Sequence, residues 1–409
     1  MAPGCYHPLE LGAGGLLACR VSDSRESPGR ELAARSGVLQ RLGATALGRR
    51  AQMVARLTET WFRRLDSPNR LVLDVTRRCN LRCSMCRTWE DPRRDELSVP
   101  EIADLIRQLP RLTWLDVTGG EPFLRSDARA LMTTIAETGR ALTVLHFPTN
   151  GWFQRRIVET CADIIALRPD LQLIVTVSID GPPAVHDEIR GRAGAYERAM
   201  GTFAALREMP GVDVYLGSTL TPQSEPTLPD LEALLRARFP DFEAREWHWN
   251  RLQISEHFFN NVDLSSRADS RDENADTRHP GLAREHVARR GLPRSMVDAM
   301  ELAFLINLEF YARGEPSGIR CESLRSTAFV SPEGDLYPCH VWDRPLGNLR
   351  EHSFAQLWHA PETLEARRGV EALDCGGCFT PCEAYPALAG NPIQTLRQTA
   401  RRSLRLVTE

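Results

Sequence analysis

Apolar runs with a period of two alternate with longer segments of helical period through the middle of the chain. Six runs are expected to be strands, at 71–76, 112–120, 141–147, 171–180, 212–220 and 243–250. The segments between them are expected to be helices, at 101–109, 126–138, 153–166, 195–208 and 228–238. Repeated strand–helix units predict an α/β fold with a parallel sheet. Six units favour a partial (β/α)6 TIM-like barrel, with its chemistry at the carboxyl ends of the strands.

Outside this core the pattern changes, and we expect five parts in the chain. They are a helical extension at 1–68, the barrel core at 69–250, an insertion or lid with a connecting helix at 251–316, a small cysteine-rich domain at 317–390 and a basic helix at 391–409. Residues 37–65 are basic and amphipathic. This pattern is typical of a helix packed on the main domain, or of one that lies on a membrane surface or a partner.

Composition excludes several functional classes. The 51 basic residues are all arginines, so Schiff-base catalysis by lysine and a P-loop lysine are excluded. A net charge of −3 indicates no nucleic-acid partner. No apolar run is long enough to span a bilayer, and the first residues lack the basic start of a secretory signal. We expect a cytoplasmic protein, and the basic terminal stretches leave peripheral membrane contact open.

Eight of the 11 cysteines fall into two groups, which indicates metal ligation rather than disulfides. The first group, Cys79, Cys83 and Cys86, follows the first predicted strand with C-x3-C-x2-C spacing. Thiolates suit iron–sulfur clusters and zinc. Three ligands on one loop can hold three irons of a [4Fe–4S] cube and leave the fourth iron open. A zinc site with a distant fourth ligand is the alternative.

The stretch CNLRCSMC resembles the signature loop of the radical S-adenosylmethionine (SAM) superfamily. The resemblance implies a partial barrel and a [4Fe–4S] cluster that binds SAM at its open iron, with Met85 near the adenine. It also implies an external one-electron donor such as flavodoxin or ferredoxin. The expected reaction is reductive cleavage of SAM to a 5′-deoxyadenosyl radical, which abstracts a hydrogen atom from an unidentified substrate.

Further family motifs follow the later predicted strands. The resemblance implies that the GGEP turn receives the SAM amino group, that a TNG motif and an SIDG motif face SAM, and that an arginine meets its carboxylate. The residues concerned are Gly119, Gly120, Glu121 and Pro122, then Asn150, then Ser178 and Asp180, and finally Arg190. An ordinary turn, loop or helix cap is the alternative for each. His186 and Asp187 are interpreted as structural.

The second cysteine group consists of Cys321, Cys339, Cys375, Cys378 and Cys382. It resembles the SPASM/twitch extension of radical SAM enzymes, which binds auxiliary [4Fe–4S] clusters. With five cysteines we expect one auxiliary cluster, held by Cys321, Cys339 and two of the other three. A hairpin is expected at 331–339. A structural zinc knuckle is the alternative.

The sequence leaves the substrate open among small molecules, sugar-like compounds and peptides. Residues of the sixth predicted strand would lie at the barrel mouth and are candidate substrate contacts: Glu246, Trp247, His248, Trp249 and Asn250. Packing within the fold is favoured for both tryptophans. Two other functions stay open, namely a membrane-associated radical SAM enzyme acting on a lipid and a non-catalytic iron–sulfur or zinc metalloprotein.

Overall fold

The computed structural model describes residues 65–91, 95–264 and 282–408, together with Ala55 and Glu59. Most of the amphipathic stretch expected at 37–65 and most of the polar stretch at 262–280 therefore lie outside the described residues.

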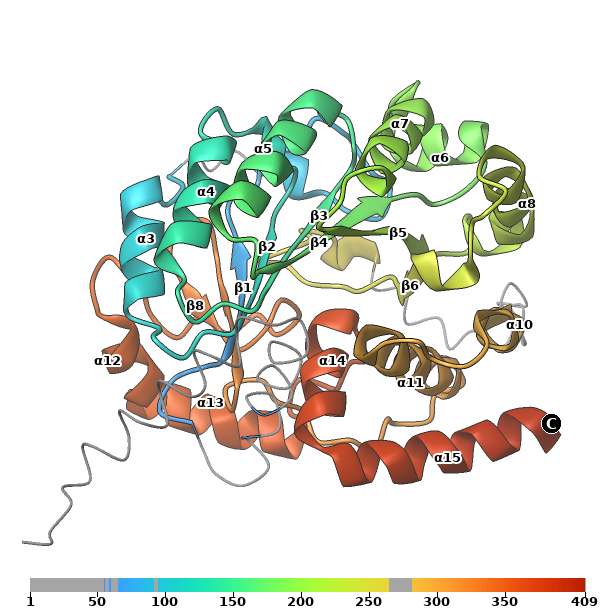
Figure 1. Ribbon diagram of the computed structural model, residues 1–409. Helices are drawn as coiled ribbons and strands as arrows, with labels where there is room; N and C mark the ends of the chain where they lie inside the picture. The colour runs from blue at the N-terminus through green and yellow to red at the C-terminus, as the bar shows by residue number, and fades with distance from the viewer. Residues whose placement is uncertain (1–54, 56–58, 60–64, 92–94, 265–281, 409) are drawn as a thin grey trace, which may run out of the picture.

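All six predicted strands are present and form a parallel sheet in chain order (Figure 1). They are β1 (Arg70–Asp74), β2 (Trp114–Thr118), β3 (Val144–Thr149), β4 (Gln172–Ser178), β5 (Val212–Leu220) and β6 (Trp247–Arg251). Parallel strands require crossover connections, and helices supply them between successive strands. The prediction of an α/β fold with a six-unit parallel sheet is confirmed.

The crossover helices cover the outer, convex face of the sheet. They are α3 (Val99–Arg107), α4 (Ala128–Thr138), α5 (Gln154–Leu167), α6 (Pro183–Ile189), α7 (Ala195–Arg207) and α8 (Leu228–Arg238). On β4, the side chains of Leu173, Val175 and Val177 are buried against these helices, whereas the alternate positions are only half-buried. The period of two therefore separates an apolar outer face from a more accessible concave face.

The cysteine-rich region does not stand apart from the sheet. Strand β7 (Thr327–Val330) pairs in parallel with the free edge of β1, and β8 (Leu336–Tyr337) pairs antiparallel with β7. The sheet therefore has eight strands in the order β6-β5-β4-β3-β2-β1-β7-β8. The expected hairpin is present, with Gly334 at φ 91° in its turn, but its first strand begins before residue 331.

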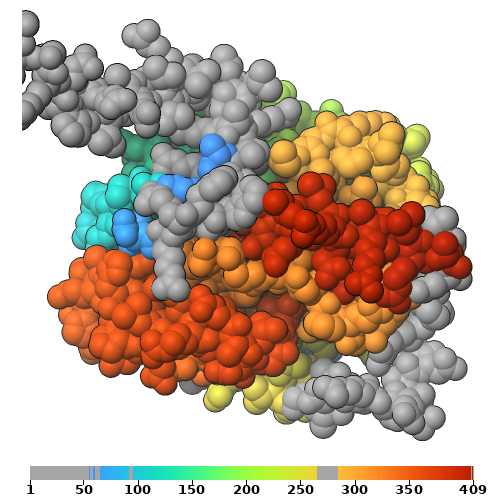
Figure 2. All heavy atoms as spheres, turned by 90° about the horizontal axis from the view of Figure 1, so that it is seen from below, coloured from blue at the N-terminus to red at the C-terminus, as the bar shows by residue number. Residues whose placement is uncertain are grey.

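Two helices close the lower end of the concave face. Trp114, Val144 and Ile174 pack there against Met300 of α11 (Met296–Ala312) and Tyr385 of α14 (Pro381–Gly390). The basic helix expected at 391–409 is α15 (Pro392–Thr408), which runs along the surface of this end (Figure 2). Helices α12 (Phe354–His359) and α13 (Pro361–Ala372) complete this side. Among the helices described here, none combines the length and the apolar character needed to cross a membrane.

The outer edge of β6 is covered by α10 (Leu282–Arg290). The Arg290 guanidinium donates to the Trp247 carbonyl at 3.0 Å, and His286 Nε2 lies 3.1 Å from the same oxygen. Since an unpaired strand edge invites association with other chains, these contacts protect the end of the sheet.

Candidate active site

The three cysteines of the first group lie on the loop that follows β1, at the carboxyl end of the sheet. The loop backbone is held by residues after β4, because Arg82 N donates to the Arg190 carbonyl at 3.0 Å and Ser84 N to the Ile189 carbonyl at 2.9 Å. Leu81 and Met85 are buried in a small apolar cluster with Ile189. The position of the loop at the carboxyl end of the sheet is therefore fixed by backbone hydrogen bonds and apolar contacts.

The thiols of this loop have surroundings that suit iron ligands. The Leu81 amide donates to Cys79 Sγ at 3.5 Å, and the Arg190 guanidinium donates to Cys83 Sγ at 3.8 Å. Burial raises the pKa of the Cys79 thiol to about 12 and that of Cys83 to about 11. The protein alone therefore does not ionise these thiols at neutral pH, and coordinated iron would supply the missing positive charge.

Within the described part of the chain, no three His, Cys, Asp or Glu side chains lie close enough together to hold a single metal ion. Each protein ligand of a [4Fe–4S] cube binds a different iron, so the ligands stand further apart than those of a single ion. The donor set on this loop, three thiols with amide and guanidinium donors beside them, fits a cube with one open iron.

The glycine turn after β2 packs directly against the backbone that leads into the cysteine loop. A Cβ atom on Gly119 would lie 2.5 Å from the Thr76 carbonyl oxygen, and one on Gly120 would lie 2.4 Å from the Arg78 carbonyl oxygen. The Gly120 amide donates to the Thr76 carbonyl at 2.7 Å. The glycines thus allow two backbone segments to lie in direct contact, which a side chain at either position would prevent.

Glu121 is fully buried between the ends of β2 and β3. Its carboxylate accepts hydrogen bonds from the Asn150 amide at 2.8 Å, the Thr149 hydroxyl at 2.9 Å and the Phe123 amide at 3.2 Å. Burial raises its pKa to about 7. The Asn150 side chain in turn donates to Asn80 Oδ1 at 2.9 Å, so Glu121 connects the GGEP turn to the cysteine loop through Asn150.

Asp180 and Arg190 form a buried pair beside the same loop. The Arg190 Nε atom donates to Asp180 Oδ2 at 2.6 Å, and the Thr219 amide donates to Asp180 Oδ1 at 2.9 Å. The pair places the guanidinium against Cys83. Ser178, at the end of β4, lies on the concave face and is half-buried.

His186 and Asp187 have contacts typical of structural residues. His186 Nδ1 accepts the Asp180 amide at 3.0 Å, and burial lowers the histidine pKa to about 4. Asp187 accepts the amides of Gly194 at 2.6 Å and Tyr196 at 2.8 Å, so it holds the start of α7.

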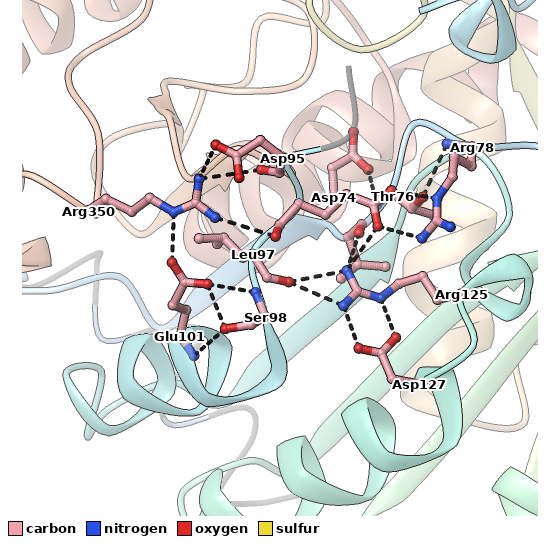
Figure 3. Close-up of polar contacts among 12 residues, drawn as sticks. Asp74, Thr76, Arg78, Asp95, Leu97, Ser98, Glu101, Arg125, Asp127 and Arg350 are labelled. Carbon is pink, nitrogen blue, oxygen red and sulfur yellow. Dashed lines mark hydrogen bonds and ion pairs between the residues drawn. The ribbon is translucent and has the colours of Figure 1, made fainter. Parts of the chain in front are cut away.

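A second polar network holds the base of the cysteine loop (Figure 3). The Arg78 guanidinium forms two hydrogen bonds with Glu96, at 2.9 and 2.6 Å. Arg125, which follows the GGEP turn, donates to the Val75 carbonyl at 2.8 Å and pairs with Asp127. The segment that ends β1 is therefore fixed before the first cysteine is reached.

The concave face carries polar side chains that the sequence analysis missed. The His146 ring has Nδ1 2.7 Å from Asp116 Oδ1 and Nε2 3.0 Å from Thr176 Oγ1. Asp116 also pairs with buried Arg70 at 2.6 Å. These residues alternate with apolar neighbours along β1 to β4. Polar residues at the inward-facing positions of the predicted strands could therefore have identified them in the sequence.

Of the five candidate contacts around β6, only two belong to the concave face. His248 and Asn250 pair with Gly217 and Thr219 of β5 and share their face. The other three do not, because Glu246 forms an ion pair with Arg207 at 2.8 Å and the two tryptophans are buried in the opposite core. Trp247 and Trp249 alternate with these two positions along β6.

The auxiliary cysteines gather from three separate stretches of chain. Cys321 precedes β7, Cys339 follows β8, and the others lie at the start of α14 or just before it. The thiol of Cys378 interacts electrostatically with those of Cys321, Cys339, Cys375 and Cys382. Amides donate to two of the sulfurs, from Ser323 to Cys321 at 3.4 Å and from Trp342 to Cys339 at 3.3 Å. A group of neighbouring thiols, two of which accept hydrogen bonds from backbone amides, fits an iron–sulfur cluster.

Comparison with known proteins agrees with this arrangement. The radical SAM superfamily model matches residues 73–235, and the model of an iron–sulfur cluster-binding domain, SPASM, matches residues 321–382. The mycofactocin maturase MftC of Mycolicibacterium smegmatis is 32% identical over 348 residues, which cover 81% of this chain and 81% of that protein. The pre-heme d1 synthase of Dinoroseobacter shibae is 28% identical over 350 residues, covering 78% and 80%.

Among solved structures, SuiB of Streptococcus suis shows a distant likeness, with a TM-score of 0.49 and 14% identity over 83% of this chain and 78% of that one. The family model, the maturase relative and the two cysteine sites agree with one another. The chain therefore belongs to the radical SAM superfamily, as an enzyme with a SPASM domain whose cofactors are SAM and [4Fe–4S] clusters.

Proposed function

We propose that this enzyme cleaves SAM reductively at the loop of Cys79, Cys83 and Cys86 and uses the resulting radical to take a hydrogen atom from a substrate held on the concave face. The observation that carries the proposal is the set of three thiols on one loop at the mouth of the sheet. A cluster bound there would supply one electron to SAM, received from an external donor such as flavodoxin or ferredoxin.

The residues around the loop divide into two proposed roles. Arg190 and Ser178 are proposed to contact SAM directly, because the guanidinium lies against Cys83 and the hydroxyl ends a strand on the concave face. Asp180 is proposed to orient Arg190. Since the Glu121 carboxylate already accepts hydrogen bonds from three protein groups, we propose that it acts mainly by holding Asn150 towards the loop. Met85 is proposed to flank the adenine.

The substrate is proposed to carry hydrogen-bonding groups. Asp116, His146 and Thr176 form a polar row across the concave face, and His248 and Asn250 continue that face towards the sixth strand. Relatives are named for heme synthesis and for the maturation of mycofactocin and subtilosin. A peptide or a polar small molecule therefore suits this face better than a lipid chain.

The decisive experiment measures 5′-deoxyadenosine after anaerobic reconstitution with iron and sulfide, followed by dithionite and SAM. The wild-type chain is expected to form it, even as slow turnover without substrate. Cys83→Ala is expected to abolish the product. Cys161→Ala is the matched control, because Cys161 is a buried thiol of the core that belongs to neither cysteine group, and it should leave product formation unchanged.

Iron counting tests the cofactors independently of turnover. Two cubes correspond to about eight irons per chain, and Cys83→Ala should lose about half of them. Zinc at the first loop, or no 5′-deoxyadenosine from fully loaded wild-type protein, would refute the proposal.

A further inference from the structure

A short segment after β6 lies between the two cysteine sites and contacts both. It comprises residues 255–261, and we call it the 255–261 segment. Its aromatic residue Phe258 packs with Phe329 of β7 and Tyr337 of β8, next to Val72 of β1. Residues far apart in the sequence are therefore joined here in one buried cluster.

On one side the segment holds the loop of the first cysteine group. Buried Asn261 donates from Nδ2 to the Met85 carbonyl at 2.9 Å and to the Gln253 carbonyl at 2.9 Å. Its Oδ1 accepts the Ser255 amide at 3.1 Å. Both amide hydrogens of Asn261 are thus used, and one of them fixes the residue before Cys86.

Two further bonds continue this attachment beyond the last cysteine of the loop. The Arg87 amide donates to the Phe259 carbonyl at 2.8 Å, and the Thr88 hydroxyl donates to the Phe258 carbonyl. The same hydroxyl lies 3.4 Å from Cys86 Sγ. The position of the Cys86 sulfur therefore depends on the backbone of the 255–261 segment.

On the other side the segment holds the auxiliary site. The His257 ring stacks on Tyr337, with ring centroids 4.1 Å apart and an interplanar angle of 9°. Its Nε2 lies 3.0 Å from the Cys339 carbonyl oxygen, and its Nδ1 contacts the Asp343 carboxylate. Asp343 also accepts the amides of His257 at 2.7 Å and Glu256 at 2.9 Å. A ligand-bearing loop is thus bonded directly to the segment.

We infer that the 255–261 segment couples the two cysteine sites, with His257 and Asn261 as positioning residues for the loop of Cys79, Cys83 and Cys86. A cluster in the auxiliary site fixes the Cys339 loop. Through its contact with the Cys339 carbonyl, His257 then fixes the 255–261 segment, and Asn261 fixes the Met85 carbonyl in turn. The inference rests on the proposed function, because it assigns a regulator to the site where SAM is cleaved.

The test replaces His257 by Phe, which keeps a ring for stacking on Tyr337 and removes both hydrogen bonds. The electron paramagnetic resonance (EPR) spectrum of the reduced first cluster is recorded with and without SAM, and KM for SAM is measured from 5′-deoxyadenosine formation. A second chain carries Cys375→Ala and Cys378→Ala, which empty the auxiliary site and leave unchanged Cys339, whose carbonyl oxygen contacts His257.

We expect His257→Phe to raise KM for SAM about fivefold or more and to alter the EPR spectrum of the first cluster. The auxiliary-site variant should show the same changes, and the combination of both should show no more than either alone. His286→Phe is the matched control, since His286 is also buried, stacks on Trp249 at 4.0 Å and contacts a backbone carbonyl, but at the edge of β6. It should leave KM and spectrum unchanged.

Two outcomes would overturn the inference. One is a His257→Phe enzyme with wild-type KM and spectrum, and the other is independent, multiplying effects of His257→Phe and the auxiliary variant. If His257→Phe does not fold, Asp343→Asn weakens the same contact and is read in the same way. If wild-type protein forms no 5′-deoxyadenosine, the proposed function fails, whereas the SAM-free spectra of the first cluster still decide whether the segment couples the sites.

Discussion

At the scale of the residue, contact between backbones explains why glycine is needed beneath the cysteine loop. Gly120 is surrounded by the carbonyl groups of Arg77 and Arg78, which cannot move away without moving the loop itself. A flexible side chain could give way by rotation, but a backbone carbonyl that belongs to the ligand loop cannot. A larger residue in this turn would therefore displace the loop that carries the cysteines.

Gly120→Ala is expected to lower the free energy of unfolding by at least about 2 kcal/mol and to reduce the iron content of the reconstituted protein. Gly201→Ala is its control, because Gly201 lies inside α7 and a Cβ atom there would lie 3.4 Å from its nearest neighbour, Gln154 Oε1. That change should stabilise the protein by roughly 0.5–1 kcal/mol. Thermal unfolding and iron analysis give both values, and equal behaviour of the two variants would contradict the explanation.

Residues that bear chemistry could be predicted from the sequence where they lie close together in the chain. The function of Cys79, Cys83 and Cys86 is indicated by their spacing alone. Asn261 and His146 do not, since their partners, such as Met85 and Asp116, are distant in the sequence. Their importance arises only when the strands are paired and the segment after β6 folds back.

At the scale of the element, the contact between α11 and α14 contains a buried acid. The Tyr385 hydroxyl donates to Glu301, and burial raises the pKa of Glu301 from 4.5 to about 7. The folded protein therefore binds a proton at this site between those two pH values, whereas the unfolded chain does not. The stability contributed by this proton is complete below pH 4.5 and is lost as the pH rises through about 7.

Glu301→Gln is expected to remove this pH dependence, because an amide still accepts the tyrosine hydrogen bond and never ionises. Relative to wild type, the variant should gain on the order of 2 kcal/mol between pH 5 and pH 8. The difference in unfolding temperature between the two proteins, measured at each pH, cancels effects that they share. A difference that does not change with pH would show that Glu301 does not titrate in this range.

The periodicity of the sequence located all six core strands, because each has a continuous apolar outer face, and five of the six crossover helices. It did not reveal that β7 extends the same sheet. The run TAFV of β7 is short, and its partner β1 lies far back in the chain, so local pattern carries no information about that pairing. Helix α6 was also missed, since its seven residues begin at a proline and show little periodicity.

At the scale of the whole molecule, two arginines join the auxiliary region to the barrel in different ways. Arg70 of β1 is buried, pairs with Asp116 and donates to the Cys382 carbonyl. Arg350 lies at the surface and pairs with Asp95 at 2.6 Å and Glu101 at 2.7 Å (Figure 3). Removing Arg70 would leave the buried Asp116 carboxylate without its cation, whereas removing Arg350 affects only carboxylates at the surface.

Arg70→Met is therefore expected to destabilise the protein by about 3–5 kcal/mol, whereas Arg350→Ala should cost about 1 kcal/mol or less. Thermal unfolding of the two reconstituted variants measures the difference. Similar losses from both changes would mean that burial does not govern how the two regions are joined.

The position of β1 between β2 and β7 has a consequence for how the protein is made. On the ribosome, β1 emerges early, and β2 can pair with one of its edges soon afterwards. Its other edge must wait until Thr327 has been synthesised, so a nascent chain carries an open row of amides and carbonyls for most of translation. Production in cells should accordingly depend on chaperones that shield this edge until β7 has been synthesised.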